Sequence, residues 1–121
     1  MTNSRGNILW VDDEIDHLKP HILFLEDKGF NISLATNGPD AIALVKNETF
    51  HLVLMDQFMP GQDGIETVRQ LYELRPNLPV IMITKSEEEW LMDEAISRKL
   101  AQFLIKPVNP TQIFMACKQV L

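Results

Sequence analysis

The stretch ILWVDDE, residues 8–14, joins a short apolar run to three consecutive acids. The apolar part is too short for a helix and does not alternate with polar residues, which is typical of a strand buried on both faces of a sheet. Acids at the end of such a strand repel one another and lose hydration, so they need a compensating charge. The stretch therefore predicts a buried strand with a charged site at its carboxyl end.

Four further apolar runs, rich in β-branched residues, follow the first: ISLA (32–35), LVLM (52–55), VIMI (80–83) and FLI (103–105). Helical patterns lie between and after them, at 16–28, 39–47, 64–74, 87–99 and 110–121. Pro39 and Pro110 at first-turn positions and Asn109 as a cap mark two of the helix starts. Short connections between alternating strands and helices favour right-handed crossovers. The predicted fold class is α/β, a doubly wound parallel sheet of five strands.

Composition limits the classes of function. The 121 residues, 45% hydrophobic and 23% charged, suit one globular domain with its own core. A net charge of −6 and no basic run argue against direct binding of nucleic acid. The sequence shows no signal-peptide pattern and no apolar run of membrane-spanning length, so we expect a cytoplasmic domain without a membrane partner. The single cysteine, Cys117, falls in an apolar helical pattern and is expected to be a buried small hydrophobe.

Residues with reactive or charged side chains follow four of the five apolar runs. Asp12 and Asp13 follow the first run, Asp56 the third, Thr84 the fourth and Lys106 the fifth. In a parallel sheet these carboxyl ends share one edge, where ligands of open α/β folds bind. The sequence therefore predicts one site that combines three acids, a hydroxyl and an amine.

Three carboxylates that converge need a cation, and hard oxygen ligands with retained waters suit Mg²⁺ better than zinc or calcium. Mg²⁺ held by few protein ligands usually serves a phosphoryl group, whose other oxygens need a cation and a hydroxyl donor. Lys106 and Thr84 supply these groups. A carboxylate can take a phosphoryl group as an acyl phosphate, and Asp56, alone at its strand end, is the predicted acceptor.

Each feature also has a simpler interpretation. The only role of the DDE acids could be to complement the dipole of the following helix, and Thr84 could be an ordinary strand residue. Lys106 and Pro107 could form an ordinary turn. His17 and His21 have the spacing of a helical metal pair, but no third ligand follows, so a solvated face is expected. The coincidence of four residue types at four strand ends nevertheless favours a shared site.

The motifs VDDE (11–14), LMDQFMPGQDG (54–64), IMITKS (81–86) and FLIKP (103–107) together resemble the receiver domain of two-component response regulators, the CheY-like fold. The resemblance covers essentially the whole chain and implies one receiver domain over residues 1–121, with strand order 2-1-3-4-5. More narrowly, MITKSEEE (82–89) and LIKPVNPTQI (104–113) are similar to PorX-type regulators, in which a PglZ module accompanies the receiver. The chain is therefore expected to belong to a longer protein with a C-terminal output module.

The resemblance implies that Asp56 accepts a phosphoryl group from a phosphohistidine on a sensor histidine kinase. Asp13, Asp56 and the backbone carbonyl of Phe58 would ligate Mg²⁺, and Asp12 would act largely through water. The expected function is phosphorelay signalling by a switch with at most weak autophosphatase activity, so the domain is not expected to be an enzyme.

The family pattern also implies how the switch works. Thr84 and Lys106 would bind phosphoryl oxygens, Phe103 would change rotamer when Thr84 moves, and Pro107 would follow a cis bond. The output would be a changed face around the fourth helix, fifth strand and fifth helix. A phosphorylation-dependent homodimer is a further expectation for that face.

Three residues around the site, Phe58, Lys85 and Ser86, are expected to modulate it, and the first two depart from the usual family pattern. The stretch SRKLAQF (97–103) also departs from it, because it lacks the glycines usual before the fifth strand. Phe58 is bulky and apolar, which predicts slow self-dephosphorylation, whereas Lys85 and Ser86 directly follow Thr84 and alter its surroundings. Two other functions stay open. A phosphohydrolase with an Asp nucleophile and Mg²⁺ would want a general acid where Phe58 stands, and a degenerate interaction module would no longer accept phosphate.

Overall fold

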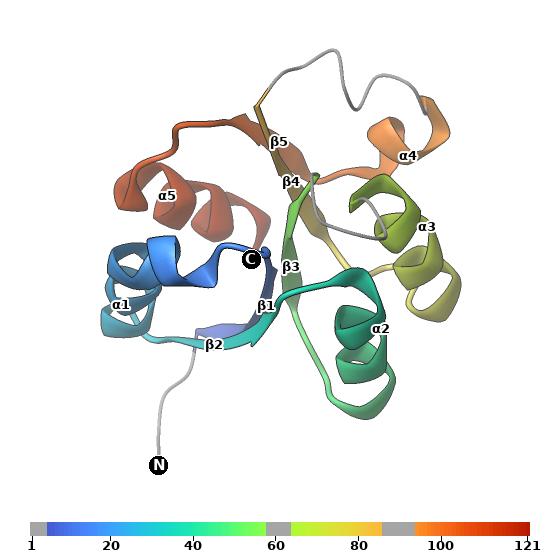
Figure 1. The fold of residues 1–121 in the computed structure, drawn as a ribbon, viewed down its shortest axis with the longest axis horizontal. Coiled ribbons are helices and arrows are strands. Elements are labelled where there is room, and N and C mark those ends of the chain that lie inside the picture. The colour runs from blue at the N-terminus through green and yellow to red at the C-terminus, as the bar shows by residue number, and fades with distance from the viewer. Residues whose placement is uncertain (1–4, 58–63, 86–93) are drawn as a thin grey trace.

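The computed structural model describes residues 5–57, 64–85 and 94–121. Every predicted apolar run lies in a strand: β1 (Gly6–Val11), β2 (Phe30–Ala35), β3 (Leu52–Asp56), β4 (Val80–Thr84) and β5 (Gln102–Ile105). All neighbouring pairs are parallel, and the strand order is β2-β1-β3-β4-β5 (Figure 1). The predicted fold class and strand order are therefore confirmed.

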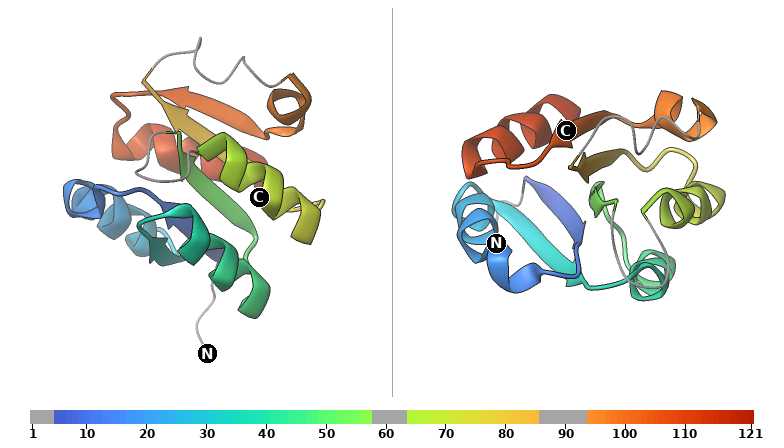
Figure 2. Two further views of the ribbon diagram at one scale, coloured as in Figure 1. Left: turned by 45° about the vertical axis from the view of Figure 1, so that its right-hand side comes forward. Right: turned by 45° about the horizontal axis from the view of Figure 1, so that its top comes forward.

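Helices cover both faces of the sheet. They are α1 (Lys19–Asp27), α2 (Gly38–Asn47), α3 (Gly64–Leu74), α4 (Glu94–Lys99) and α5 (Pro110–Val120). Figures 1 and 2 show α1 and α5 on one face and α2 and α3 on the other, with α4 beside α3. Because strand side chains alternate, Ile8 and Trp10 pack toward α1 and α5, whereas Leu9 and Val11 pack toward α2 and α3. The sheet thus separates two apolar cores.

Burial differs between central and edge strands. Every residue of β3 and β4 is buried, but β2 and β5 are partly exposed because each has a neighbouring strand on one side only. The prediction of strands buried on both faces was therefore correct for the central strands and wrong for the two edges. Cys117 is fully buried on α5, and burial raises the pKa of its thiol to about 12, so it behaves as the predicted small hydrophobe.

Helix boundaries follow local capping chemistry. Asn109 caps α5: its side chain accepts from the Gln112 amide, and the Gln112 side chain accepts from the Asn109 amide. The first helix differs from the predicted 16–28, since a 3₁₀ turn (Ile15–Leu18) precedes α1. Pro20 has no amide hydrogen to donate to an earlier turn, so the α-helix starts only just before it. The predicted start of the fourth helix lies outside the described residues, and no helix that the structure describes is long and apolar enough to cross a membrane.

Candidate functional site

The carboxyl edge of the sheet brings the three predicted acids together. One carboxylate oxygen each of Asp12, Asp13 and Asp56 lies within 4.8 Å of the others. Asp12 follows β1 and Asp56 ends β3. Because these strands are neighbours in the sheet, the fold itself brings the two carboxylates together. Asp12 and Asp56 are buried, with 4% and 3% of their surfaces exposed, whereas Asp13 is exposed. The site therefore has a buried floor and one acid open to solvent.

Lys106 reaches the same place from the other side of β4. Its Nζ donates to Asp56 Oδ1 at 3.0 Å, forming an ion pair in which the Asp56 side chain is almost fully buried. Thr84, at the end of β4, is completely buried, and its backbone carbonyl accepts from the Lys106 amide at 2.7 Å. In register, Asp56 is opposite Ile83, the residue before Thr84. Thr84 and Lys106, the residues predicted to supply the hydroxyl and the amine, therefore both lie at strand ends next to that of Asp56.

Electrostatics at this edge favour an added cation. Burial raises the pKa of Asp12 above its ordinary value, and the negative charges of Asp56 and Asp13 raise it further. The Glu14 amide, which donates to Asp12 Oδ1 at 2.8 Å, and the Lys106 ammonium act in the opposite direction. Carboxylate oxygens that are close together and partly solvent-accessible are the hard ligands that Mg²⁺ prefers. The donor set thus fits the ion that the sequence implied.

The remaining predicted residues lie around this cluster or outside the described chain. Phe103 is on β5, three positions before Lys106, and is 38% exposed. The Lys106–Pro107 peptide bond is cis. Lys85 is exposed. Phe58 and Ser86 fall outside the described residues.

Gln57 is a site residue that the sequence analysis missed. It follows Asp56 directly and is 4% exposed. Its backbone carbonyl accepts from the Gly64 amide at 2.9 Å, and its side-chain Oε1 accepts from the Ile65 amide at 3.0 Å. It thereby satisfies two amides that the first turn of α3 leaves without a helical partner. These bonds span seven and eight residues, so the local sequence patterns that predict helix caps do not reveal them.

Gly64 is needed where α3 begins because the chain passes close to Asp56. A Cβ at position 64 would lie 2.5 Å from the Asp56 carbonyl oxygen and 2.9 Å from the Gln57 Cα. Both contacts are with backbone, which cannot rotate away as a side chain can. Close packing of the start of α3 therefore restricts the position of the Asp56 backbone.

His17 and His21 do not share one solvated face. His17 is exposed beside Glu14, with Nδ1 and Oε2 at 3.3 Å. His21 is partly buried, its Nε2 lies 2.8 Å from the Val108 carbonyl oxygen, and its ring meets the Trp10 ring edge-on. The predicted solvated face is correct for His17 and wrong for His21. The contact with Val108 joins residues 87 positions apart, which helical spacing cannot reveal.

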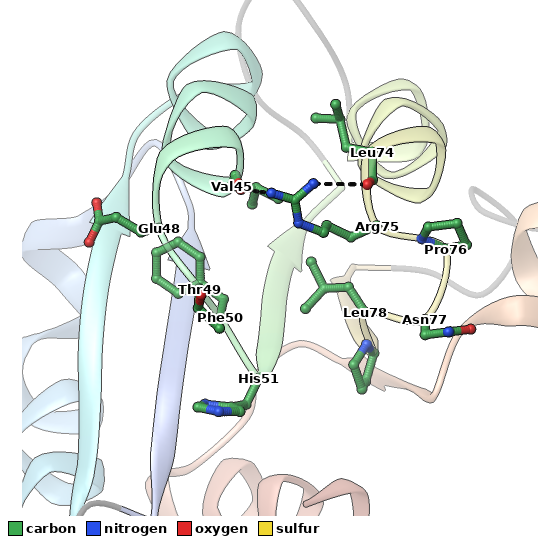
Figure 3. Close-up of a pocket in the computed structure, with 11 residues that line it drawn as sticks. Val45, Glu48, Thr49, Phe50, His51, Leu74, Arg75, Pro76, Asn77 and Leu78 are labelled. Carbon is green, nitrogen blue, oxygen red and sulfur yellow. Dashed lines mark hydrogen bonds between the residues drawn. The ribbon is translucent and has the colours of Figure 1, made fainter.

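Cavities are found at both ends of the strands, the amino edge and the carboxyl edge of the sheet. One of about 440 Å³ lies at the amino edge, between the segments that lead into β3 and β4 (Figure 3). There Arg75 ties two helix ends together by donating to the carbonyl oxygens of Val45 and Leu74. No predicted site residue lines it. A second cavity, of about 360 Å³, lies at the carboxyl edge and includes Asp12 and Lys106 in its wall.

Comparison with known proteins agrees with this arrangement. A family model described as "Response regulator receiver domain" matches residues 8–118. The transcriptional regulatory protein ZraR of Escherichia coli (strain K12) is 35% identical over 109 residues, which are 90% of this chain and 25% of that protein. ResD of Bacillus subtilis is 34% identical over 114 residues, 94% of this chain and 47% of that protein. The chain thus spans about a quarter to a half of the length of these relatives.

Solved structures show the same fold. A CheY-like receiver domain protein from Methanospirillum hungatei superimposes with a TM-score of 0.86 and 30% identity, over 96% of this chain and 93% of that chain. TrrA from Thermotoga maritima, solved in complex with Mg(2+)-BeF, has a TM-score of 0.84 and 24% identity, over 95% of this chain and 98% of that chain. The second likeness is one of fold alone.

Proposed function

Because the chain belongs to the family of response regulator receiver domains, we propose that it acts in phosphorelay signalling and that Asp56 is its phosphoacceptor. The observation that carries this proposal is the position of the Asp56 carboxylate, which is buried, 3.0 Å from the Lys106 ammonium and clustered with two further acids. The environment orients one carboxylate and offers compensating charge for the anionic group that it would receive.

The proposed reaction moves a phosphoryl group between two side chains. An Asp56 carboxylate oxygen attacks the phosphorus of a phosphohistidine on a sensor histidine kinase. A new O–P bond forms as the N–P bond breaks, and the electron pair of the N–P bond returns to the imidazole. The product is an acyl phosphate on Asp56 and a free histidine on the kinase.

Asp12, Asp13 and Asp56 would hold Mg²⁺, as their clustered oxygens support. The Phe58 backbone carbonyl is the further ligand that the family pattern implies. The ion supplies charge that offsets the crowded carboxylates and the incoming phosphoryl oxygens. Because Asp13 is exposed, solvent and the phosphoryl donor could reach the metal site from its side.

Thr84 and Lys106 would bind two of the new phosphoryl oxygens and so bias a two-state equilibrium. Lys106 would exchange its present bond to the Asp56 carboxylate for one to the phosphoryl group. Phe103, partly exposed on β5, would change rotamer with Thr84. A coupling of about 1–3 kcal/mol changes partner affinity by about 5- to 150-fold. The α4-β5-α5 face is the proposed output surface, for an output module, a partner protein or a second phosphorylated copy.

The setting of the domain is also part of the proposal. It would work in the cytoplasm as a switch with at most weak autophosphatase activity, within a longer regulator. The relatives above are ZraR-type and ResD-type transcriptional regulators, so the narrower resemblance to PorX-type regulators with a PglZ module stays a prediction.

Intact mass spectrometry tests the proposal. The protein is incubated with acetyl phosphate, with Mg²⁺ or with EDTA, and compared with an Asp56→Asn variant. The wild type should gain the mass of one phosphoryl group only with Mg²⁺, and the variant should gain none. Equal modification of the variant would exclude Asp56, and no modification of a folded wild type would favour the degenerate interaction module. Steady turnover of small phosphoesters would instead support the phosphohydrolase.

A further inference from the structure

Three cations gather around the Phe114 ring on α5. The Arg5 Cζ atom lies 5.7 Å from the ring centroid, and the Nζ atoms of Lys28 and Lys118 lie at 5.6 Å and 5.4 Å. Lys28 Nζ is also 5.2 Å from the centroid of the Phe24 ring, which meets Phe114 edge-on. Arg5 and Lys118 are exposed, whereas Lys28 and the two rings are partly buried. We call the three cations and Phe114 the basic patch.

The fold assembles the basic patch from three separate segments. Arg5 precedes β1, Lys28 follows α1, and Lys118 is in the last turn of α5. Figure 1 shows α1 and α5 side by side on one face of the sheet. A Cβ on Gly6, where β1 begins, would lie 3.4 Å from the side chain of Leu121, which follows α5. The patch therefore lies at the amino edge of the sheet, at the opposite ends of the strands from the acidic site.

The charges of the basic patch are not balanced within the described part of the chain. Among residues 5–57, 64–85 and 94–121, none of its three cations forms an ion pair, and this includes the nearby acids Glu26 and Asp27. Cation–π attraction offsets the mutual repulsion only in part, because it is weak at exposed sites. The negative ends of the helix dipoles account for Lys28 and Lys118, but Arg5 is on no helix. The patch therefore offers positive charge for a partner to neutralise.

The side chains of the basic patch are held in position before a partner binds. The Arg5 amide donates to the Gly29 carbonyl oxygen at 2.9 Å, and Arg5 Cγ is 3.3 Å from where a Cβ on Gly29 would be. The Lys28 ammonium lies over two aromatic rings. Side chains that are already ordered lose less entropy on association. The arrangement therefore favours binding.

We propose that the basic patch binds an acidic segment of a partner protein. Carboxylates of the segment pair with Arg5, Lys28 and Lys118, and an apolar side chain packs on the partly buried Phe114 ring. Charge complementarity favours a short segment, because the chain as a whole has a net charge of −6. Extended polyanions such as nucleic acid or an anionic membrane would also come near the acids elsewhere on the domain, which repel them.

Fluorescence anisotropy with a labelled peptide tests the proposal. The probe is a short fluorescein-labelled peptide of repeated Glu-Glu-Leu, and its control has glutamine in place of every glutamate. The protein should bind the acidic peptide saturably at low salt and more weakly as the salt concentration rises, since exposed charges are screened. The glutamine peptide should not bind.

Variants locate the binding on the basic patch. Arg5→Gln, Lys28→Gln and Lys118→Gln should each weaken peptide binding about two- to fivefold, the value of one exposed charge pair. Lys46→Gln is the matched control, because Lys46 is also an exposed lysine in the last turn of a helix, but on α2 at the other face of the sheet. It should bind the peptide as the wild type does.

The outcomes separate this proposal from its alternatives. No saturable binding by the folded wild type, equal binding of the glutamine peptide, or an equal loss in Lys46→Gln would overturn it. Tighter binding to phosphatidylserine vesicles or to duplex DNA, lost when all three cations are replaced, would overturn it in favour of that partner. The triple variant should be phosphorylated by acetyl phosphate as the wild type is, so this proposal and the phosphoacceptor proposal can fail separately.

Discussion

Lys106 Nζ lies 3.0 Å from Asp56 Oδ1, although the two residues are 50 positions apart and their strands are separated by β4. The pair spans the end of the central strand that carries Thr84. The Asp56 side chain is almost fully buried, whereas the Lys106 side chain is 29% exposed. An ammonium in this position compensates the charge of the buried carboxylate. Because its side chain is partly exposed, it can also move to pair with an anionic group that is added to Asp56.

Replacing this ammonium should destabilise the protein. Lys106→Met leaves the buried Asp56 charge without this partner, at a cost of about 1–3 kcal/mol, since Lys106 is not itself fully buried. Added Mg²⁺ should recover part of the loss by supplying positive charge. Urea denaturation with and without Mg²⁺ measures both effects. Lys85→Met, at an exposed lysine nearby, is the control and should change stability by less than about 0.5 kcal/mol.

Removing one acid should stabilise the metal-free protein. The pKa of Asp12 is raised in the folded state, so that state binds the proton more tightly than the unfolded chain does. Stability is then lost as pH rises from the ordinary carboxyl pKa through the raised one. Asp12→Asn lacks this loss, and its side-chain oxygen can still accept from the Glu14 amide.

Thermal unfolding in EDTA at neutral pH should therefore give a Tm a few degrees higher for Asp12→Asn than for the wild type. Mg²⁺ should raise the Tm of the wild type more than that of the variant. A variant that is less stable than the wild type in EDTA would show that Asp12 is stabilising and not in conflict with its neighbours.

A methyl group at position 64 should disturb the acceptor. In Gly64→Ala the new Cβ would lie 2.5 Å from the Asp56 carbonyl oxygen, so the backbone must shift, at about 1–3 kcal/mol. Phosphorylation by acetyl phosphate should slow as well. Gly29→Ala is a matched control because Gly29 has a φ of +101° but lies far from the acids in sequence and fold. It should lose stability with an unchanged phosphorylation rate; slowing in both variants would indicate a general loss of folding.

The residue two positions after the acceptor should control phosphate lifetime. Phe58 is apolar and bulky, which should hinder the approach of water to the acyl phosphate, and Phe58→Asn should dephosphorylate several-fold faster. The decay of the phosphorylated mass after removal of acetyl phosphate measures this rate. A lifetime in Phe58→Asn equal to or longer than that of the wild type would assign slow decay to another residue.

The strands and their shared edge were predictable because both follow from short-range pattern. Apolar runs of strand length, each ended by a polar residue, place Asp12, Asp56, Thr84 and Lys106 at one edge once the sheet is parallel. Burial on the edge strands was not predictable in this way, because composition alone does not say which strands lie outermost. The order of strands required the family resemblance.

Contacts between distant segments were beyond sequence pattern. Gln57 binds amides of residues 64 and 65 through both its backbone and its side chain. His21 contacts the Val108 carbonyl oxygen and packs on Trp10, although the sequence led us to expect a solvated face. Each of these depends on how two elements approach in space. They lie beside Asp56, at the start of α3, and in the wall of the carboxyl-edge cavity.

A crystal structure of the protein with Mg²⁺ and beryllofluoride, a phosphoryl mimic, tests the central claim most directly. The account predicts beryllium bonded to an Asp56 oxygen and one Mg²⁺ among Asp12, Asp13 and Asp56. Lys106 Nζ should leave the Asp56 carboxylate for a fluorine. Beryllofluoride on another residue, or an ion bound away from these acids while Lys106 keeps its 3.0 Å bond to Asp56, would contradict it.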